Sequence, residues 1–197
     1  MDSIVLGEIV DKEVIVNGEM VSKRLKVSSI SECNENGKEI HLKDSDGFEL
    51  WRDYDSMGNM VHFKNNEGSE GWREYDDKGN EIHRKSSSGF ESWCEYDSKG
   101  NLIHSKYSNG EEIWYEYDNK GNRIRLKKNN GEEVSYEYDS MGNIVHFKNN
   151  GGFEGWYEYD SKGNEIYFKN SHGGEEWNEY TFWDNGKVKT QITYRPF

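Results

Sequence analysis

Histidine recurs at a fixed interval along this chain, and histidine is the side chain best suited to metal binding and to proton transfer near neutral pH. The interval is 21 residues, and the column contains His41, His62, His83, His104 and His146. If each interval forms two strands, neighbouring histidines lie roughly 9 to 10 Å apart. A zinc ion cannot reach two of them at ligand distances of about 2 Å. Arg125 and Tyr167 also occupy the column, so we interpret it as an outward polar position and predict no metal site.

Carboxylates recur with the same period and form two further columns. The first contains Glu49, Glu70, Glu91, Glu112, Glu133, Glu154 and Glu175. The second contains Asp53, Glu74, Glu95, Glu116, Glu137, Glu158 and Glu179. A glycosidase needs one pair of carboxyl groups in two distinct environments, and a regular series offers none. Phosphate loops and the CxxC, HExxH and GxSxG motifs are also absent, so we predict no enzyme, no catalytic residue and no cofactor.

The composition indicates an ordered, acidic protein. Apolar residues make up 32 % of the chain, but it holds 7 Trp, 13 Tyr and 8 Phe, and disordered chains are poor in these large side chains. The formal net charge is −13. Such a surface repels phosphate backbones, so we predict no direct binding to nucleic acid. It can instead attract a basic protein, although solubility alone would also explain it.

The start of the chain and its cysteines bear on its location. The opening MDSIVLGEIVDKEVIV lacks a basic segment followed by an apolar run, which predicts no secretory signal. No stretch approaches the ~18 apolar residues of a membrane span. Cys33 and Cys94 fall in different columns of the repeat and are typical of reduced thiols. We therefore expect a cytoplasmic protein with no membrane partner.

The histidines and carboxylates belong to a repeat of 21 residues whose other columns are aromatic and glycine. Each copy has two turn signals separated by short segments rich in Tyr, Trp, Ile and Phe, which is typical of strands. The predicted fold is all-β: about eight repeats form an antiparallel hairpin meander of roughly 16 or more strands, joined in one long twisted or coiled sheet. One tryptophan column contains Trp51, Trp72, Trp93, Trp114, Trp156 and Trp177, and we interpret it as core, with an exposed binding stripe as the alternative.

The two turns of each copy carry different signals. The first, such as YDSMGN, predicts a type I turn followed by a left-handed glycine that forms a bulge. The glycines of this structural column are Gly58, Gly79, Gly100, Gly121, Gly142 and Gly163. The second turn, such as Asn109-Gly110 or Asn130-Gly131, has two central residues typical of a type I′ turn.

The odd period predicts one bulge in each copy. Side chains alternate between faces with period two, so an odd period would move the tryptophans to the opposite face in every copy unless one extra residue restores them. With the bulge at the first turn, Trp51 pairs with Phe63, and Phe63 pairs with Trp72. This face would also carry Val61, Asp53 and Glu74. The opposite face would carry Tyr54, His62, Lys64, Arg73 and Tyr75, which leaves the glutamates without an evident basic partner.

Both ends depart from the repeat and read as capping hairpins, which repeat arrays need to close their exposed strands. We predict one repeat domain, 1–197, with an N-terminal cap at 1–25 that turns at Asn17-Gly18. The repeats occupy 26–180, and a C-terminal cap at 181–197 turns at Asn185-Gly186.

The segment GEEIWYEYDNKGNRI, residues 110–124, resembles the YD repeat of the RHS proteins, whose unit runs from Gly to Tyr-x-Tyr-Asp-x-x-Gly-Arg. Asn122 stands where that family usually has Arg, and the tryptophan column is an addition. The resemblance covers about residues 26–180 and implies a β-hairpin repeat. In large RHS proteins such repeats form a shell around a toxin. Short acidic repeat proteins also resemble the immunity proteins of contact-dependent inhibition and RHS systems, which bind and neutralise a toxin in the cytosol.

Three functions are consistent with these patterns. The first is an immunity protein or antitoxin that binds a basic toxin, such as a nuclease. Its predicted partner-binding residues are Glu74, Glu95, Glu116, Glu137, Glu158, Trp93 and Trp114. The second is a carbohydrate-binding or surface module that uses the tryptophan stripe. The third is a structural fragment of a larger shell, which the capping hairpins argue against.

Overall fold

The computed structural model describes residues 5–17 and 19–196. Their regular structure consists of 18 strands, without a helix. In the first half these are β1 (Ile9–Val16), β2 (Glu19–Lys26), β3 (Ser29–Cys33), β4 (Glu39–Asp44), β5 (Glu49–Tyr54), β6 (Met60–Asn65), β7 (Glu70–Tyr75), β8 (Glu81–Ser86) and β9 (Glu91–Tyr96). In the second half they are β10 (Leu102–Tyr107), β11 (Glu112–Tyr117), β12 (Arg123–Lys128), β13 (Glu133–Tyr138), β14 (Ile144–Asn149), β15 (Glu154–Tyr159), β16 (Glu165–Asn170), β17 (Glu175–Phe182) and β18 (Val188–Tyr194). The prediction of an all-β hairpin repeat is confirmed.

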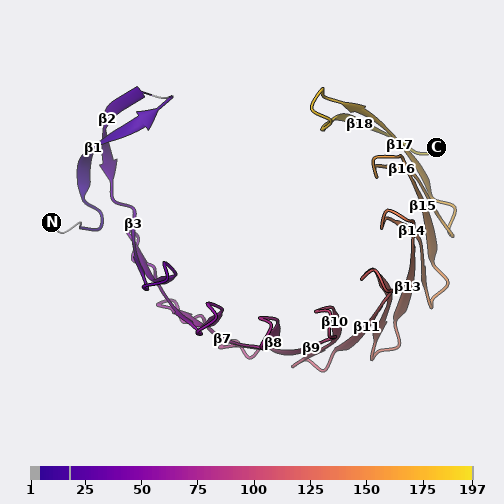
Figure 1. Ribbon diagram of the computed structural model, residues 1–197, viewed down its shortest axis with the longest axis horizontal. Coiled ribbons are helices and arrows are strands. Elements are labelled where there is room, and N and C mark those ends of the chain that lie inside the picture. The colour runs from indigo at the N-terminus through magenta and orange to yellow at the C-terminus, as the bar shows by residue number, and fades with distance from the viewer. Residues whose placement is uncertain (1–4, 18, 197) are drawn as a thin grey trace. The chain divides into compact units, whose positions relative to one another are not determined.

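The strands are arranged in the order of the sequence (Figure 1). β1 and β2 form a separate antiparallel hairpin, in which Val16 pairs with Glu19. β3 to β18 follow one another in a sheet of 16 strands. The chain divides into two compact units, the first ending at Trp93 and the second starting at Cys94. The predicted boundaries of the capping hairpins stay predictions, and Gly18 of the first predicted cap turn lies outside the described residues.

The predicted structural glycines all lie in turns with left-handed backbone. Their φ angles are 85° at Gly58, 83° at Gly79, 88° at Gly100, 90° at Gly121, 91° at Gly142, 82° at Gly163, 87° at Gly110 and 91° at Gly131. The predicted type I turn with a glycine bulge is confirmed at the first turn: the amide of Gly58 donates to the carbonyl of Asp55, and the amide of Asp55 donates to that of Asn59.

The predicted type I′ form of the second turn is wrong. A type I′ turn needs positive φ at both central residues, and Asn17 is the one described residue other than glycine with a positive φ. The amide of Gly68 donates to the carbonyl of Asn65, and that of Asn65 donates to Ser69. The Asn65 side chain also accepts from the amides of Glu67 and Ser69. Both turns therefore have the same three-residue form. In the second turn an Asn or Asp three residues before the glycine caps four copies, at Asp44, Asn65, Asn149 and Asn170.

The invariant Asp and Asn of the first turn bind each other. The Asp118 carboxylate accepts from the amides of Lys120 and Asn122, at 2.9 and 2.8 Å, and from the Asn122 side-chain amide at 2.9 Å. These donors lower the pKa of Asp118, and the side chain of Asn122 makes the largest contribution. The asparagine that stands in place of the arginine of YD repeats thus closes the turn internally.

An odd number of extra residues in each copy keeps the tryptophans on one face, as the odd period predicts, but there are three and not one: the glycine of each turn and one more residue within the first hairpin. The register shifts between Asp53 and Tyr54, because Asp53 pairs with His62 while Tyr54 pairs with Met60, which leaves Val61 as the extra residue. The same shift recurs between β7 and β8, β11 and β12, β13 and β14, and β15 and β16.

This register corrects the predicted composition of both faces. Trp51 pairs with Lys64 and not with Phe63, and Trp72 pairs with His62. Phe63 pairs instead with Arg52 and Gly71 on the opposite face. Because side chains alternate along a strand, histidines, lysines and both carboxylate columns share the face of the tryptophans. We name it the Trp face, and the opposite face, which carries Phe63, Arg52, Tyr54 and their equivalents, the Tyr face.

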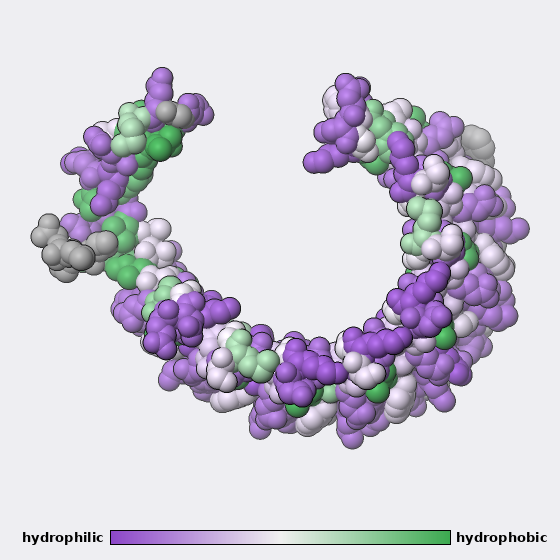
Figure 2. All heavy atoms as spheres, in the orientation of Figure 1, coloured by the Kyte–Doolittle hydropathy of each residue, from purple (hydrophilic) through white to green (hydrophobic). Residues whose placement is uncertain are grey.

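The sheet has no closed hydrophobic core among the described residues. No large apolar side chain there is buried, and the buried residues are Gly71, Ser92, Ser105, Gly155 and Asn178. The prediction that the tryptophans form a core is wrong, since Trp72 is 40 % and Trp177 is 42 % exposed. Figure 2 shows hydrophilic residues over most of the visible surface, with hydrophobic residues in small patches.

Tyrosine hydroxyl groups tie each copy to the one before it. The hydroxyl of Tyr138 donates to the main-chain carbonyl of Arg123 at 2.8 Å, and that of Tyr159 donates to Ile144 at 2.9 Å. The same contact, to the residue 15 positions earlier, is made by Tyr54, Tyr75, Tyr117 and Tyr180. This explains why the Tyr of each Tyr-Asp pair repeats.

No helix in the described part of the chain has the length and apolar character needed to cross a lipid bilayer.

Candidate protein-binding surface

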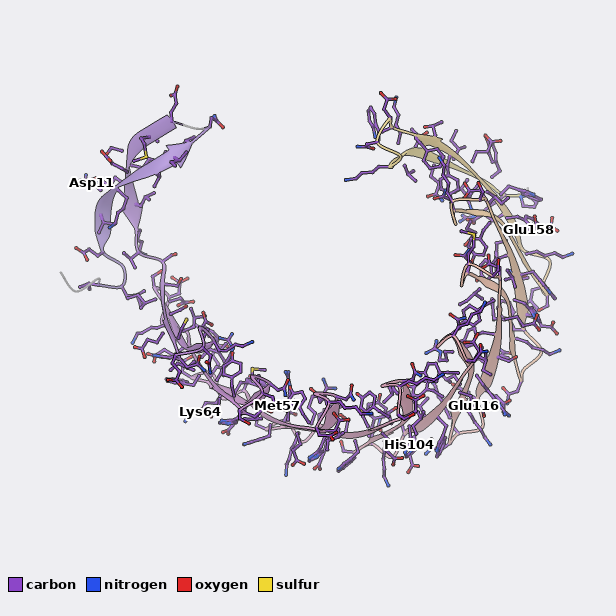
Figure 3. All side chains as sticks on the ribbon, in the orientation of Figure 1. Asp11, Met57, Lys64, His104, Glu116 and Glu158 are labelled. Atoms are coloured by element: carbon purple, nitrogen blue, oxygen red, sulfur yellow. The ribbon has the colours of Figure 1, made fainter. Side chains whose placement is uncertain are left out.

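The Trp face is built from rows of four side chains that run across neighbouring strands. In one row Asp53 of β5 lies opposite His62 of β6, His62 opposite Trp72 of β7, and Trp72 opposite Lys85 of β8. Each row is offset by two residues from the next, so the pattern acid, histidine, tryptophan, lysine is preserved while the sheet lengthens. Figure 3 labels His104, Glu116 and Glu158 of this face, from β10, β11 and β15.

Five tryptophans stack on the histidine of the preceding strand. The ring centroids lie 5.1 Å apart for His41 and Trp51, with 8° between the planes. The other stacked pairs are His62–Trp72 at 5.4 Å, His83–Trp93 at 5.3 Å, His104–Trp114 at 5.0 Å and His146–Trp156 at 5.2 Å. On the next strand Lys64 approaches the Trp51 ring to 5.7 Å. A sugar would have to displace these neighbours to stack on the indoles.

The sequence contained a signal for this stacking that we did not use. Histidine and tryptophan stand ten residues apart in every stacked pair, and one copy has neither, because Arg125 and Ser135 stand at these positions. In the last copy Tyr167 replaces histidine opposite Trp177, which is retained. The constant spacing and the loss of both residues in one copy indicate direct contact between the two columns.

The first carboxylate column, from Glu49 to Glu175, lies beside lysines and histidines of the preceding strands, and we name it the inner carboxylate column. Glu49 contacts Lys43 at 2.6 Å and His41 at 3.3 Å, and Glu154 contacts Lys148 at 2.6 Å. The hydrogen bond from lysine lowers the pKa of Glu49 and of Glu154, and the histidine contact adds to it against the opposing effect of burial. These carboxylates hold neighbouring strands together.

The second carboxylate column, from Asp53 to Glu179, contains the glutamates that we predicted to bind a partner. It is more exposed than the inner column, and we name it the outer carboxylate column. Glu74, Glu95, Glu116 and Glu137 have side chains that are 69 %, 68 %, 58 % and 73 % exposed. The expectation that they lack basic partners is wrong, because each lies 3.3 or 3.4 Å from His83, His104, Arg125 or His146 in the same order. Glu158, also exposed, lies opposite Tyr167.

His62 shows what two carboxylates do to one histidine. Its Nδ1 lies 2.8 Å from Asp53 and its Nε2 lies 2.9 Å from Glu70. Both ring nitrogens can donate only when the imidazole is protonated. The hydrogen bond to Asp53, followed by that to Glu70, raises the pKa of His62 against the opposing effect of burial.

The predicted tryptophans lie beside the predicted glutamates. Trp93 and Glu95 share β9, Trp114 and Glu116 share β11, and the residues of each pair point to the same face because they are two positions apart. Trp93 and Trp114 are 37 % and 39 % exposed. Within the described ranges, no three His, Cys, Asp or Glu side chains are grouped so that they could hold a metal ion. The arrangement is suited to contact with a macromolecule: aromatic edges beside a line of exposed carboxylates.

Solved structures with the same kind of fold include the crystal structure of TcdB2-TccC3-Cdc42, with a TM-score of 0.66 and 16 % identity over 82 % of this chain. The structure of TcdB2-TccC3 without its hypervariable C-terminal region has a TM-score of 0.67 and 15 % identity over 88 % of this chain. The structure of TcdB2-TccC3 has a TM-score of 0.63 and 13 % identity over 89 % of this chain. These likenesses support the hairpin-repeat fold and not a shared activity. No family model and no curated protein matches the chain.

The chain spans 10 to 13 % of the length of these structural neighbours. The likeness therefore concerns their repeat region alone.

Proposed function

We propose that this protein binds and masks a basic protein partner, as an immunity protein or antitoxin against a toxin of a contact-dependent inhibition or RHS system. A nuclease toxin fits best, because the surface that binds phosphates is basic and an acidic column can occupy it. The role is binding and not catalysis. The fold likeness to TcdB2-TccC3-Cdc42, a structure named for several proteins, agrees with a protein partner.

The observation that carries the proposal is the exposed outer carboxylate column of the Trp face. Its members recur once in each repeat, and Glu95, Glu116 and Glu137 keep more than half of their side-chain surface open to solvent. Each is oriented by one histidine or arginine but is not covered by it. The net charge of −13 adds long-range attraction to the local pattern, and such attraction speeds the encounter of oppositely charged proteins.

The experiment first identifies the partner. Genes that flank this one are expressed alone and together with it, and a product that stops growth alone but not in the pair is the predicted toxin. Association rates are then measured against ionic strength for the wild type and a quadruple variant with Gln at Glu95, Glu116, Glu137 and Glu158. The variant should associate more slowly, with a weaker dependence on salt, because fewer charges steer the encounter.

A control variant distinguishes the effect of the outer carboxylate column on the association rate from the effect of net charge. Glu35, Asp46, Glu67 and Asp77 are exposed turn residues, and amides at these four positions remove the same charge from elsewhere. Equal slowing in both variants would show that net charge matters and the column does not. Unchanged rates and full protection in the column variant would refute the proposal.

A further inference from the structure

An open groove of about 540 Å³ lies on the Tyr face of the second unit. It is formed by β13 to β16. Its lining residues are Val134, Tyr136, Ile144, Phe147, Tyr157, Tyr159 and Glu165. The Tyr157 ring packs between Phe168, at 4.9 Å, and Phe147, at 6.0 Å, so aromatic neighbours hold the wall of the groove in place. Glu165 is the one carboxylate in this lining.

The column to which Glu165 belongs shows how unusual its surroundings are. The residue two positions after the first-turn glycine is a carboxylate in three copies: Glu39, Glu81 and Glu165. Glu39 forms an ion pair with Arg52 and accepts a hydrogen bond from Ser31 at 2.6 Å. Glu81 lies 3.4 Å from Arg73 and 3.8 Å from Arg84. In the first unit, therefore, arginines of the chain itself neutralise this position.

The Glu165 copy lacks all three arginines. Arg52 stands 13 residues after Glu39, and the equivalent of Arg52 for Glu165 is Asn178. Arg73 stands eight residues before Glu81 and Arg84 three residues after it, and the corresponding residues are Tyr157 and Phe168. Asn178 is already engaged, because its side-chain oxygen accepts from Gln191 and Thr193.

Glu165 consequently has no cationic partner within the part of the chain that the structure describes. It is half-buried beside the aromatic rings. Burial raises the pKa of its carboxyl, and the nearby charge of Glu176 adds to this. Glu176 itself is paired with Arg195 at 2.7 Å. A partly buried carboxylate without a counter-charge is costly, and a cation from outside would relieve that cost.

An earlier copy shows which cation these surroundings accept. Arg123 occupies the same column position two copies earlier, and its guanidinium lies 5.8 Å from the Tyr115 ring and 5.2 Å from the Tyr136 ring. Tyr115 stands eight residues before Arg123, as Tyr157 does before Glu165. The aromatic residues at this position on the Tyr face thus already pack against a guanidinium group.

We propose that the groove takes an arginine side chain of a partner protein. The guanidinium would pair with the Glu165 carboxylate and lie against the rings of Tyr157 and Tyr159. Arginine fits better than lysine, because a planar guanidinium can stack on a ring while its edge donates to a carboxylate. The groove is on the face opposite the outer carboxylate column, so this inference does not depend on the proposed function.

The test uses N-acetyl-L-arginine amide as the probe and chemical shifts of the isotope-labelled full chain as the readout. Millimolar binding should shift the signals of Tyr157, Tyr159 and Glu165, while N-acetyl-norleucine amide should not. Glu165→Gln should weaken the binding about tenfold or more, since a charge-assisted hydrogen bond is lost. Asp184→Asn, which removes the same charge from an exposed turn of the second unit, should change the affinity by less than about twofold.

Tyr157→Leu gives a second variant that keeps the carboxylate and removes the ring. It should weaken arginine binding while the spectrum of the Trp face stays unchanged, which shows that the fold persists. Shifts spread evenly over both faces, or equal affinity in Glu165→Gln, would overturn the proposal. So would binding of N-acetyl-L-lysine amide or tetramethylammonium at the same residues with an affinity as high as that of arginine.

Discussion

The two faces of the sheet differ in how strictly they repeat. On the Trp face, histidine stacks on tryptophan in five copies at nearly the same distance, 5.0 to 5.4 Å. On the Tyr face, a column that holds Arg52 and Arg73 in the first unit holds Tyr115, Tyr136 and Tyr157 in the second. The backbone register is the same in both units.

The difference indicates that the two faces have different roles. The Trp face provides the contacts between neighbouring strands, and the Tyr face carries the surface chemistry that varies between copies. A single-layer sheet has no core, so each strand depends on its two neighbours. Stacked rings supply these contacts in five copies of the Trp face, and Arg125 with its paired carboxylates supplies them where Ser135 replaces tryptophan. The Tyr face keeps one fixed element, the tyrosine hydroxyl contact to the preceding copy, and its other positions are free to vary.

The largest expected effect tests the variable packing of the Tyr face. A Cβ added to Gly155 would lie 2.2 Å from the Phe147 ring, so Gly155→Ile should destabilise the protein by about 3 kcal/mol through overpacking. Ser105 and Ile113 form the equivalent pair in another copy. The double variant with Phe147→Ser and Gly155→Ile should therefore regain most of the lost free energy of unfolding, measured by chemical denaturation. Additive single effects would show that the two columns are not packed as a pair.

The next effect tests an element shared by all copies. Gly121 has a φ of 90°, a conformation in which a β-branched residue is strained, so Gly121→Val should cost about 2 kcal/mol. Lys120→Val, one residue earlier in the same turn, is the control and should cost much less. Equal melting temperatures for the two variants would contradict the turn.

A smaller effect separates the fixed tyrosine from the variable one. Tyr138→Phe removes the hydroxyl group that donates to Arg123 and should cost about 1 kcal/mol, the usual net contribution of one hydrogen bond. Tyr136→Phe, on the same strand and face, should cost less, because the structure shows only its ring in contact with Arg123. A larger loss in Tyr136→Phe would reverse the assignment of fixed and variable positions.

The smallest effect concerns pH on the Trp face. The pKa of His62 is raised above its ordinary value of 6.5 by Asp53 and Glu70. A raised folded-state pKa contributes stability that is fully present below 6.5 and is lost as pH rises through the folded pKa. Stability should thus fall slightly from pH 6 to pH 8, and His62→Gln should remove this part of the change. An NMR titration midpoint for His62 at or below pH 6.5 would contradict the raised pKa and the predicted pH dependence of stability.

Part of this architecture could be read from residues without the fold. The period of 21 residues, the strand chemistry and the glycines needing positive φ are local properties, so the hairpin meander and its first turn were predictable. The parity of the period required an odd number of extra residues per copy. The Asx-x-x-Gly spacing of Asn65 and Gly68 would also have identified the second turn, but the Asn-Gly pairs of other copies suggested the wrong form.

The number of bulges and the partners of each residue were decided by the tertiary structure. One extra residue at the first turn satisfies parity as well as three, at both turns and at Val61, and the two choices differ by one residue in opposite directions at successive hairpins. The tryptophans stay on one face in both, but Phe63 and His62 exchange faces. Contacts between strands distinguish the two, because only the observed register stacks His62 on Trp72 and lets Asp53 reach His62. The isolation of Glu165 is likewise visible only once residues from three strands are brought together.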